Sequence, residues 1–233
     1  MKHPSPLTTG TFLARRNRFL ADVRLADGRV VVAHVANTGS MRSTDAPGAE
    51  VALSFHDDPK RKLAWTLELF RVGDCWVGVN TARPNQLVAE AIAAGRVRSL
   101  AGYASLRREV RFGANSRVDL LLEDPAKGLC YVEVKNVTYR VGSRALFPDA
   151  VTDRGAKHLV ELREMARRGH RAVIFFLVNR DDCASMGPAE AIDPRYAGLL
   201  REVAAEGVEP LAYRAVNTLE ESRVARKLPV ILG

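Results

Sequence analysis

The sequence has few cysteines and no long apolar run. Cys75, Cys130 and Cys183 lie far apart and form no Cys-x-x-Cys pair, which argues against both a disulfide framework and a zinc cluster. The longest strongly apolar run, residues 172–178, is much shorter than the roughly 18 residues that a membrane span requires. The N-terminus also lacks the apolar segment of a secretory signal. We therefore expect reduced thiols, no membrane partner and a cytoplasmic location.

Three motifs that mark large enzyme classes are also absent. The sequence contains no Gly-x-Ser-x-Gly, no phosphate-binding P-loop and no Gly-x-Gly-x-x-Gly. These absences remove support for a serine hydrolase with a nucleophile elbow, for a P-loop nucleoside triphosphatase and for a dinucleotide-dependent enzyme.

Basic residues are abundant, and most of them are arginine. The 233 residues include 35 Lys and Arg against 27 Asp and Glu, which gives a net charge of +8, and 28 of the bases are Arg. Six arginines lie between positions 96 and 117 with Glu109 as their only acidic neighbour, and Lys60, Arg61 and Lys62 form a second cluster. Guanidinium groups bind phosphate oxygens in a bidentate manner, so this charge favours a nucleic-acid partner. A solvated arginine-rich surface is the alternative.

Residues 1–82 have the pattern of an all-β domain. Short β-rich runs alternate with turn sequences such as Ala26-Asp27-Gly28 and Asn37-Thr38-Gly39. The runs are 12–13, 19–25, 30–36, 51–55, 64–70 and 75–79. Five or six short strands at this spacing predict a small barrel. An OB-like barrel is the favoured candidate, because this fold commonly binds oligonucleotides, but the pattern alone does not separate it from an SH3-like barrel.

Residues 83–233 have an α/β pattern. A helix is expected from Pro84 to Ala94, followed by strands over 107–112, 117–122 and 130–135. A long amphipathic helix over 155–168, a buried strand over 171–178, a helix over 194–205 and a strand over 208–213 complete the pattern. The predicted order is αβββαβ with a further helix and strand.

Two of these strands carry the residues that suggest chemistry. Residues two apart in a strand share a face, so Glu133 and Lys135 point to one side while Val132 and Val134 point to the other. Asp119, on the neighbouring strand, can project toward Glu133. Paired carboxylates form an oxygen site for Mg²⁺ or Mn²⁺, which neutralises charge during phosphodiester cleavage. We expect Asp119 and Glu133 to be catalytic metal ligands, with Lys135 activating water or stabilising charge.

An Asp, a hairpin-like connection and Glu-x-Lys within an αβββαβ order resemble the PD-(D/E)XK nuclease superfamily. The whole chain is similar to the sugar fermentation stimulation protein family (SfsA) in six segments. They are Asn37–Met41, Trp76–Thr81, Asn115–Asp119, Tyr131–Thr138, Phe147–Thr152 and Arg154–Leu159. The resemblance implies an N-terminal OB-like β-barrel, a PD-(D/E)XK nuclease-like C-terminal domain, DNA binding and a link to sugar (maltose) utilisation.

The resemblance also suggests further catalytic residues. Glu90 lies on the helix before the strands, where some superfamily nucleases place an extra carboxylate, and Glu109 is its alternative. Lys157, on the helix after Glu-x-Lys, matches a position where related nucleases carry Gln or Lys facing the site. The neighbouring His158 is assigned no role, because a lone histidine on a helix is more often structural.

The literal Pro-Asp dipeptide, Pro148–Asp149, lies after Glu133 in the chain. The metal-binding Asp of the superfamily precedes the Glu-x-Lys strand, so this order assigns the metal role to Asp119. Asp149 then belongs to a loop, although the sequence leaves open whether it reaches the site.

Nine basic residues are the candidates for phosphate contacts. They are Arg15, Arg16, Arg18, Lys60, Arg61, Lys62, Arg107, Arg111 and Arg117. Phe55, Trp65 and Trp76 could stack on bases, but each Trp stands in an alternating strand and fits a core position equally well. The expected partner is nucleic acid, with DNA favoured, and a homodimer is left open.

Two functions compete at this point. The first is a DNA-binding protein that acts as a divalent-metal-dependent nuclease, and the second is a non-catalytic DNA-binding regulator of sugar (maltose) utilisation genes. The presence of Asp119, Glu133 and Lys135 together favours the nuclease, because charges on core strands are costly unless they are paired or hydrated. A carbohydrate-binding protein is a third reading, but the barrel shows no aromatic platform for sugars.

Overall fold

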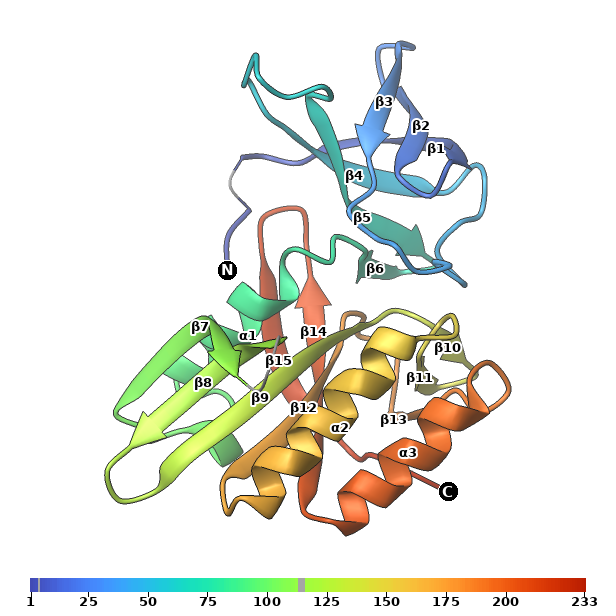
Figure 1. The fold of residues 1–233 in the computed structure, drawn as a ribbon. Coiled ribbons are helices and arrows are strands. Elements are labelled where there is room, and N and C mark those ends of the chain that lie inside the picture. Colours follow the sequence, from blue (N-terminus) through green and yellow to red (C-terminus); the bar gives the residue numbers. More distant parts are fainter. Residues whose placement is uncertain (4, 113–115) are drawn as a thin grey trace.

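A β-barrel at the N-terminal end of the chain is joined to a larger α/β unit (Figure 1). The computed structural model describes residues 1–3, 5–112 and 116–233. Asn115, which begins one of the six family-like segments, lies outside the described residues.

Five strands close the barrel. They are β1 (Thr8–Arg16), β2 (Leu20–Leu25), β3 (Val30–His34), β4 (Glu50–Phe55) and β5 (Trp65–Val72). β1 pairs with β2 and β4, and a parallel pairing of β3 with β5 completes the circle. This strand order is that of an OB barrel, so the expected barrel is confirmed and the SH3-like alternative is not. A sixth strand, β6 (Cys75–Gly78), extends the sheet beyond β5 toward the α/β unit.

Six strands form the central sheet of the α/β unit. They are β7 (Ser105–Phe112), β8 (Ser116–Asp124), β9 (Gly128–Val137), β12 (Arg171–Val178), β14 (Val208–Asn217) and β15 (Ser222–Leu228). Their spatial order is β15-β14-β12-β9-β8-β7, in which β9, β12 and β14 run parallel and the outer strands are antiparallel. The predicted α/β architecture is confirmed.

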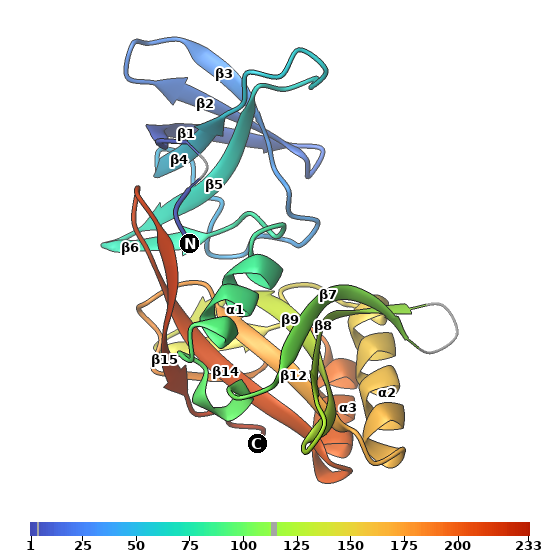
Figure 2. The same cartoon turned by 90° about the vertical axis from the view of Figure 1, so that its left-hand side faces the viewer.

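Helices cover both faces of this sheet (Figure 2). α1 (Pro84–Ala93) packs on one face, and α2 (Asp153–Arg167) and α3 (Pro194–Ala205) pack on the other. α1 and α3 begin with a proline, and the Thr152 side chain caps α2 by accepting the backbone N–H of Gly155. None of the helices in the described ranges combines the length and apolar character needed to cross a membrane.

Short elements between β9 and α3 were not expected from the sequence. β10 (Arg140–Val141), β11 (Arg144–Phe147) and β13 (Ser185–Pro188) form a small separate sheet there. A single 3₁₀ turn, η1 (Arg98–Leu100), between α1 and β7 was not expected either. The small sheet positions the loop that follows β11, which reaches the barrel.

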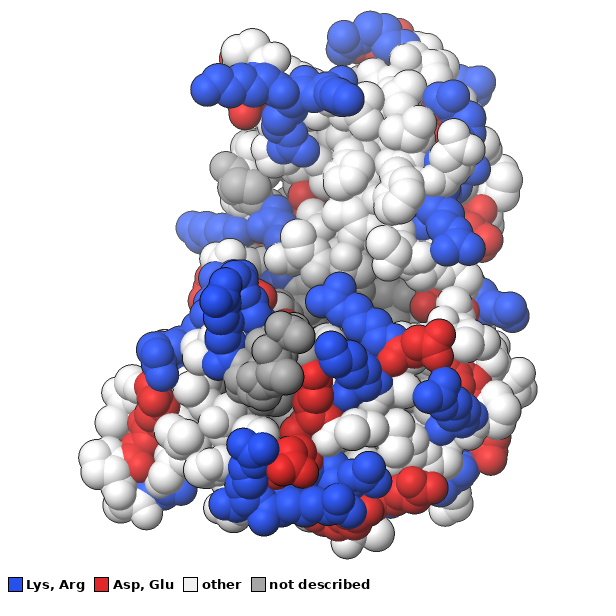
Figure 3. Space-filling model, viewed as in Figure 1, with Lys and Arg blue, Asp and Glu red and all other residues white. Residues whose placement is uncertain are grey.

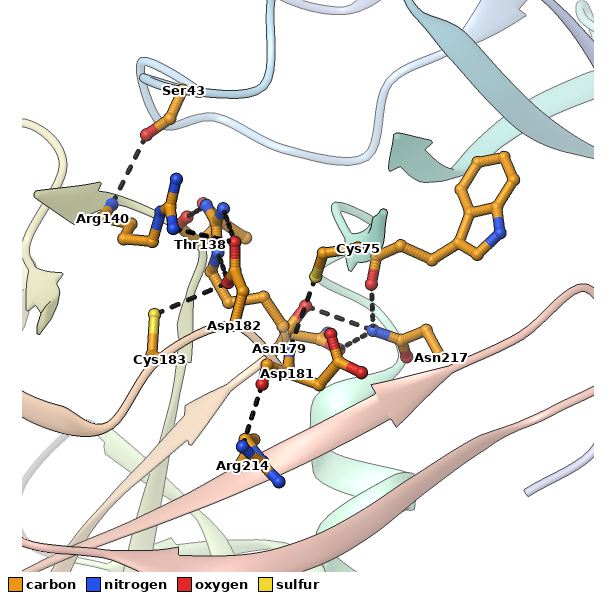
Figure 4. Close-up of polar contacts among 12 residues, drawn as sticks. Ser43, Cys75, Thr138, Arg140, Asn179, Asp181, Asp182, Cys183, Arg214 and Asn217 are labelled. Carbon is orange, nitrogen blue, oxygen red and sulfur yellow. Dashed lines mark hydrogen bonds and ion pairs between the residues drawn. The ribbon is translucent and has the colours of Figure 1, made fainter. Parts of the chain in front are cut away.

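Asparagine side chains at the ends of the three parallel strands dock the barrel onto the α/β unit. Asn136 at the end of β9 donates to the Gly78 carbonyl of β6 at 3.1 Å. Asn217 at the end of β14 donates to the Trp76 carbonyl at 3.0 Å (Figure 4). Asn179, just after β12, donates to Asn136 and accepts from Asn217, and its carbonyl accepts the N–H of Gly78 at 2.8 Å. Because these bonds are at least partly buried, they fix β6 against the ends of the sheet.

The three cysteines are free and buried. Burial raises the pKa of the Cys75 thiol to about 12, and it raises the pKa values of Cys130 and Cys183 to about 11. Since the thiolate is the reactive form, these side chains serve packing at neutral pH.

The close approach at Gly78 yields a prediction about domain docking. A Cβ on Gly78 would lie 2.3 to 2.4 Å from the side chain of Asn179. Gly78→Ala and Asn179→Ala should each lower the free energy of unfolding by about 1 to 3 kcal/mol. The double variant should lose clearly less than their sum, because Asn179→Ala removes the clashing atoms. Denaturant unfolding of all four proteins measures this coupling.

Gly198→Ala is the matched control for that experiment. Gly198 lies inside α3, where an added Cβ has no neighbour within 4 Å. Its substitution should leave stability unchanged or raise it by up to about 1 kcal/mol. Strict additivity of the Gly78 and Asn179 variants would contradict the docking account.

Candidate active site

β8 and β9 separate at the point where the candidate metal ligands lie. Their backbone pairing extends only to Leu120 and Val132, which are both fully buried. Asp119 comes one residue before Leu120 in β8, and its Oδ2 accepts a hydrogen bond from the backbone N–H of Val134 at 2.7 Å. The Asp119 carboxylate therefore lies between the separated strands, within electrostatic range of Glu133.

Asp119 is held by two donors and has a perturbed pKa. Its Oδ1 accepts a second hydrogen bond, from Nδ2 of Asn85 on α1, at 2.7 Å. Burial, followed by the negative charge of Glu133, raises the pKa of Asp119 to about 6 against the opposing effect of these hydrogen bonds. The two carboxylates repel one another, and a cation bound between them would reduce this repulsion.

Glu133 forms a tight cluster with Lys135 and His158. Its Oε1 accepts a hydrogen bond from Nζ of Lys135 at 2.7 Å and also contacts Nδ1 of His158. Nζ of Lys135 lies 3.1 Å from the same His158 nitrogen. Burial alone would raise the pKa of Glu133, but the His158 hydrogen bond and the Lys135 charge outweigh burial and lower it. Glu133 is therefore an ionised carboxylate at neutral pH.

His158 is a site residue that the sequence analysis missed. It lies on the first turns of α2, where Arg154, one turn earlier, has its Nε 3.5 Å from the other ring nitrogen. The spacing of Arg154 and His158 by four residues places both on one helix face, but the sequence alone does not show that this face meets Glu133.

Glu109, the alternative to Glu90 in the sequence analysis, lies near Asp119. It lies opposite Asp119 in the β7–β8 register, between the paired residues Arg108 and Val110. Its backbone has a φ of +53°, a conformation that non-glycine residues rarely adopt. Nδ2 of Asn85 donates to its Oε1 at 3.0 Å and so links Glu109 to Asp119.

Two predicted catalytic residues lie elsewhere. Glu90 is five positions after Asn85, about 140° further around α1, and its carboxylate contacts Gln86 and the amino group of Met1. Lys157 is 57% exposed and pairs with Glu161 at 3.6 Å. In the structure, Asn85 and His158 contact Asp119 and Glu133, whereas Glu90 and Lys157 contact other residues.

The basic candidates on the barrel have different surroundings. The guanidinium of Arg15 is already bonded within the barrel, because it donates to the carbonyls of Arg18, Asn37, Gly39 and Ser40. Arg16 pairs with Asp22 at 2.6 Å. Arg18 is exposed and lines the cleft described below.

The remaining basic candidates lie in the β4–β5 connection and on β7 and β8. Figure 3 shows that Lys and Arg side chains lie over both the barrel and the α/β unit on the face in view. Lys60 and Lys62 are exposed in the β4–β5 connection, and Arg61 donates to the Thr66 hydroxyl at 3.0 Å. Arg107 forms an ion pair with Glu123 at 2.8 Å, so its guanidinium is less available to bind phosphate.

Arg111 and Arg117 are directly opposite one another in the β7–β8 register, and both are exposed. Within the described ranges, neither has an ion pair with a carboxylate. Like charges placed directly across a strand pair destabilise it unless an anion lies between them. This pair is therefore the strongest phosphate-binding candidate on the α/β unit.

The aromatic candidates are partly committed to packing. Phe55 is 46% exposed and packs against Trp65, with ring centroids 4.9 Å apart. Trp76 is half-buried beneath the guanidinium of Arg71, at 5.1 Å from its ring. Phe55 thus offers more free ring surface than either tryptophan.

A cleft of about 360 Å³ lies between the barrel and the site. Its barrel side is lined by Arg18 and the loop Asn37–Gly39, and its α/β side includes Asn85, Lys135 and the loop 147–152. The cleft thus places barrel residues opposite side chains that contact Asp119 and Glu133 directly.

Asp149 connects the two walls of this cleft. Its Oδ2 accepts the backbone N–H of Met41 at 2.9 Å, and its carbonyl accepts the Ser40 hydroxyl at 2.6 Å. A Cβ on Gly39 would lie 2.7 Å from the Asp149 carboxylate oxygens, so only glycine fits there. Asp149 thus lines the same cleft as Lys135, and its carboxylate bonds to the barrel.

The donor set at Asp119 and Glu133 consists of carboxylate oxygens, which suits a hard divalent cation. Within the described part of the chain, no group of three or more His, Cys, Asp or Glu side chains is arranged to hold a metal ion. A cation at this site would therefore rely on the two carboxylates, with water or substrate oxygens completing its coordination.

Comparisons with known proteins agree with this architecture. A profile described as the SfsA N-terminal OB domain matches residues 13–79, and one described as the sugar fermentation stimulation protein RE domain matches residues 82–221. The protein is thus an OB barrel joined to a restriction-endonuclease-like α/β domain. The chain belongs to the sugar fermentation stimulation protein family.

Relatives match over nearly the full chain. Sugar fermentation stimulation protein homologs from Geobacter sulfurreducens and Geobacter metallireducens are 56% and 57% identical, over 99% and 100% of this chain and 98% and 100% of theirs. The structure of Pyrococcus furiosus SfsA in complex with Ca²⁺ is 31% identical and covers 99% of this chain and 98% of that one, with a TM-score of 0.90.

The raised pKa of Asp119 leads to a pH prediction for the metal-free protein. Its folded pKa of about 6 exceeds the ordinary value of 3.8, so the stabilisation it provides is complete below pH 4 and is lost as pH rises through 6. At about 1.4 kcal/mol per pH unit, Asp119→Asn should be more stable than wild type by up to about 3 kcal/mol at pH 7.5.

Denaturant unfolding in EDTA between pH 4 and pH 8 measures this difference. The advantage of Asp119→Asn should shrink toward pH 4, because the folded wild-type carboxyl is then protonated and the unfolded carboxyl is close to its ordinary pKa of 3.8. A difference that does not change with pH would mean that altered hydrogen bonding, not ionisation, separates the two proteins.

Proposed function

We propose that the protein is a divalent-metal-dependent nuclease that hydrolyses phosphodiester bonds in DNA. The observation that carries this proposal is the placement of Asp119, Glu133 and Lys135 at the separation of β8 and β9, beside a cleft that the barrel partly covers. The Ca²⁺ complex of the Pyrococcus relative supports metal binding, and the carboxylate oxygens favour Mg²⁺ or Mn²⁺ as the working ion.

In this proposal, Asp119 and Glu133 hold the cation. The cation, when bound, neutralises the negative charge that develops on the phosphoryl group. Lys135 lines the cleft, where its ammonium can orient the attacking water or stabilise the same charge. His158 fixes Lys135 relative to Glu133 through contacts to both. Asn85 orients the Asp119 carboxylate from the α1 side.

The barrel and the basic residues around the cleft would bind the DNA backbone. We place nucleic-acid binding in residues 1–82 and catalysis in residues 83–233. The net charge of +8 supports an anionic partner, as do Arg111 and Arg117, which form no ion pair with the residues that the structure describes. All proposed catalytic residues come from one chain, so a homodimer is not required to complete the site. The buried free thiols fit a reducing cytoplasm.

A cleavage assay with Asp119→Ala tests the proposal. Wild-type protein should cleave labelled DNA in Mg²⁺ or Mn²⁺ and be inactive in EDTA. Asp119→Ala should lose activity by a factor of about 100 or more, because one of the two carboxylate ligands is missing. Gel retardation of the same DNA should be retained by the variant, which separates catalysis from binding.

Asp74→Ala is the control for this assay, because Asp74 is a fully exposed carboxylate in the β5–β6 turn. It should cleave at the wild-type rate. Binding without cleavage by the wild-type protein would favour the non-catalytic regulator. Cleavage of RNA alone would contradict the choice of DNA.

Two neighbouring residues on α2 give a second, sharper comparison. His158→Ala should lower kcat by about 10- to 100-fold with little change in KM, because Lys135 loses the group that positions it. Lys157→Ala should change kcat by less than about threefold, because its side chain is largely exposed and paired with Glu161. Equal losses in both variants would contradict the assignment.

A further inference from the structure

The β1–β2 turn places an arginine where the backbone favours glycine. The turn consists of residues 17–19, and Asn17 and Arg18 have φ values of 49° and 63°. Asparagine tolerates this left-handed conformation, whereas a long side chain adopts it rarely. A residue kept in an unfavourable backbone conformation points to a role for its side chain.

The position of Arg18 relative to the cleft is fixed by Arg15. Nε of Arg15 donates to the Arg18 carbonyl at 2.9 Å, and its terminal nitrogens donate to the carbonyls of Asn37, Gly39 and Ser40. One guanidinium thus ties the turn to the loop that forms the barrel wall of the cleft. The Arg18 guanidinium itself has no hydrogen bond or ion pair with any of the described residues.

The cleft that Arg18 lines is small, and one side of it is fastened. Its volume of about 360 Å³ lies at the low end of the roughly 300 to 1,000 Å³ typical of small-ligand pockets. Asp149 bonds to Ser40 and Met41 across it, so the walls cannot part without breaking these bonds. With its walls fastened in this way, a cleft of this size admits one nucleotide of a single strand but not two paired strands.

The residue after Arg18 supports an unpaired strand. Phe19 is 48% exposed although it is a large aromatic residue. Exposed aromatic rings beside a cation form the usual stacking surface for bases of single-stranded nucleic acid. Bases within a duplex are already stacked on one another and do not offer a face to such a ring.

We infer that the substrate is single-stranded DNA, such as an unpaired end or flap, and that Arg18 binds a backbone phosphate adjacent to the scissile one in the cleft between the β1–β2 turn and Lys135. This inference rests on the proposed nuclease function, and it adds the substrate class and the residue that selects it. Phe19 stacks on a neighbouring base in the same arrangement.

Arg18→Gly and Asn17→Gly form a matched pair of variants. Glycine suits both backbone positions, so neither change should unfold the barrel. Binding of a fluorescent single strand and of the corresponding duplex is measured in EDTA, as a function of salt concentration. The full-length wild-type protein should bind the single strand at least about ten times more tightly than the duplex. Arg18→Gly should lose about five- to tenfold in single-strand affinity and lower the salt slope by about 0.7, while Asn17→Gly behaves as wild type.

Equal affinity for single strand and duplex, or equal behaviour of the two glycine variants, would overturn the inference. Because binding is measured without metal, its outcome is separate from that of the nuclease proposal. Single-strand binding through Arg18 without cleavage in Mg²⁺ or Mn²⁺ would contradict the nuclease alone. Equal cleavage of duplex and single strand would contradict the substrate assignment alone.

Discussion

The hydrogen bond from the Val134 backbone to the Asp119 carboxylate is the interaction on which the candidate site depends. It replaces the next backbone bond of the β8–β9 ladder, so the two strands separate where Asp119 and Glu133 face one another. The separation is stable because Asn85 donates to the other oxygen of Asp119 and because Leu120 and Val132 anchor both strands in the core. Paired carboxylates are thereby held in a partly buried place at an electrostatic cost that a cation would offset.

The barrel matters to this site because it is held rigidly above it. Asn136 follows Lys135 by one residue and docks β6, so the strand that carries Glu133 and Lys135 also fixes the barrel. On the opposite side, Asp149 binds the loop that Arg15 organises. These contacts fasten the walls of a cleft that the Arg18 side chain lines. Under the proposed function, the fastened walls would limit which nucleic acids reach the carboxylates.

Much of this architecture could be predicted from the sequence, because alternation of apolar residues determines strands and their faces. Val132, Glu133 and Lys135 illustrate this, since one strand register places the valine in the core on one face of the sheet. It places the two charged residues on the other face, where Glu133 meets His158 of α2. The sequence pattern predicted a barrel but not its closure by β3 and β5, nor the short strands β10, β11 and β13. These pairings depend on contacts between distant segments, which leave no hydrophobic periodicity in the sequence.

Side-chain roles on helices and turns were harder to predict. The rotation of α1 brings Asn85 rather than Glu90 to Asp119, and the seating of α2 brings His158 rather than Lys157 to Glu133. Arg15 and Arg18 are equally basic in the sequence, and only the three-dimensional structure separates the one that binds carbonyls from the one that lines the cleft.

The most direct test of the central claim is to locate Mn²⁺ by anomalous diffraction in crystals of this protein. The account predicts a strong peak bonded to the carboxylates of Asp119 and Glu133, and a well-ordered site without such a peak would contradict it.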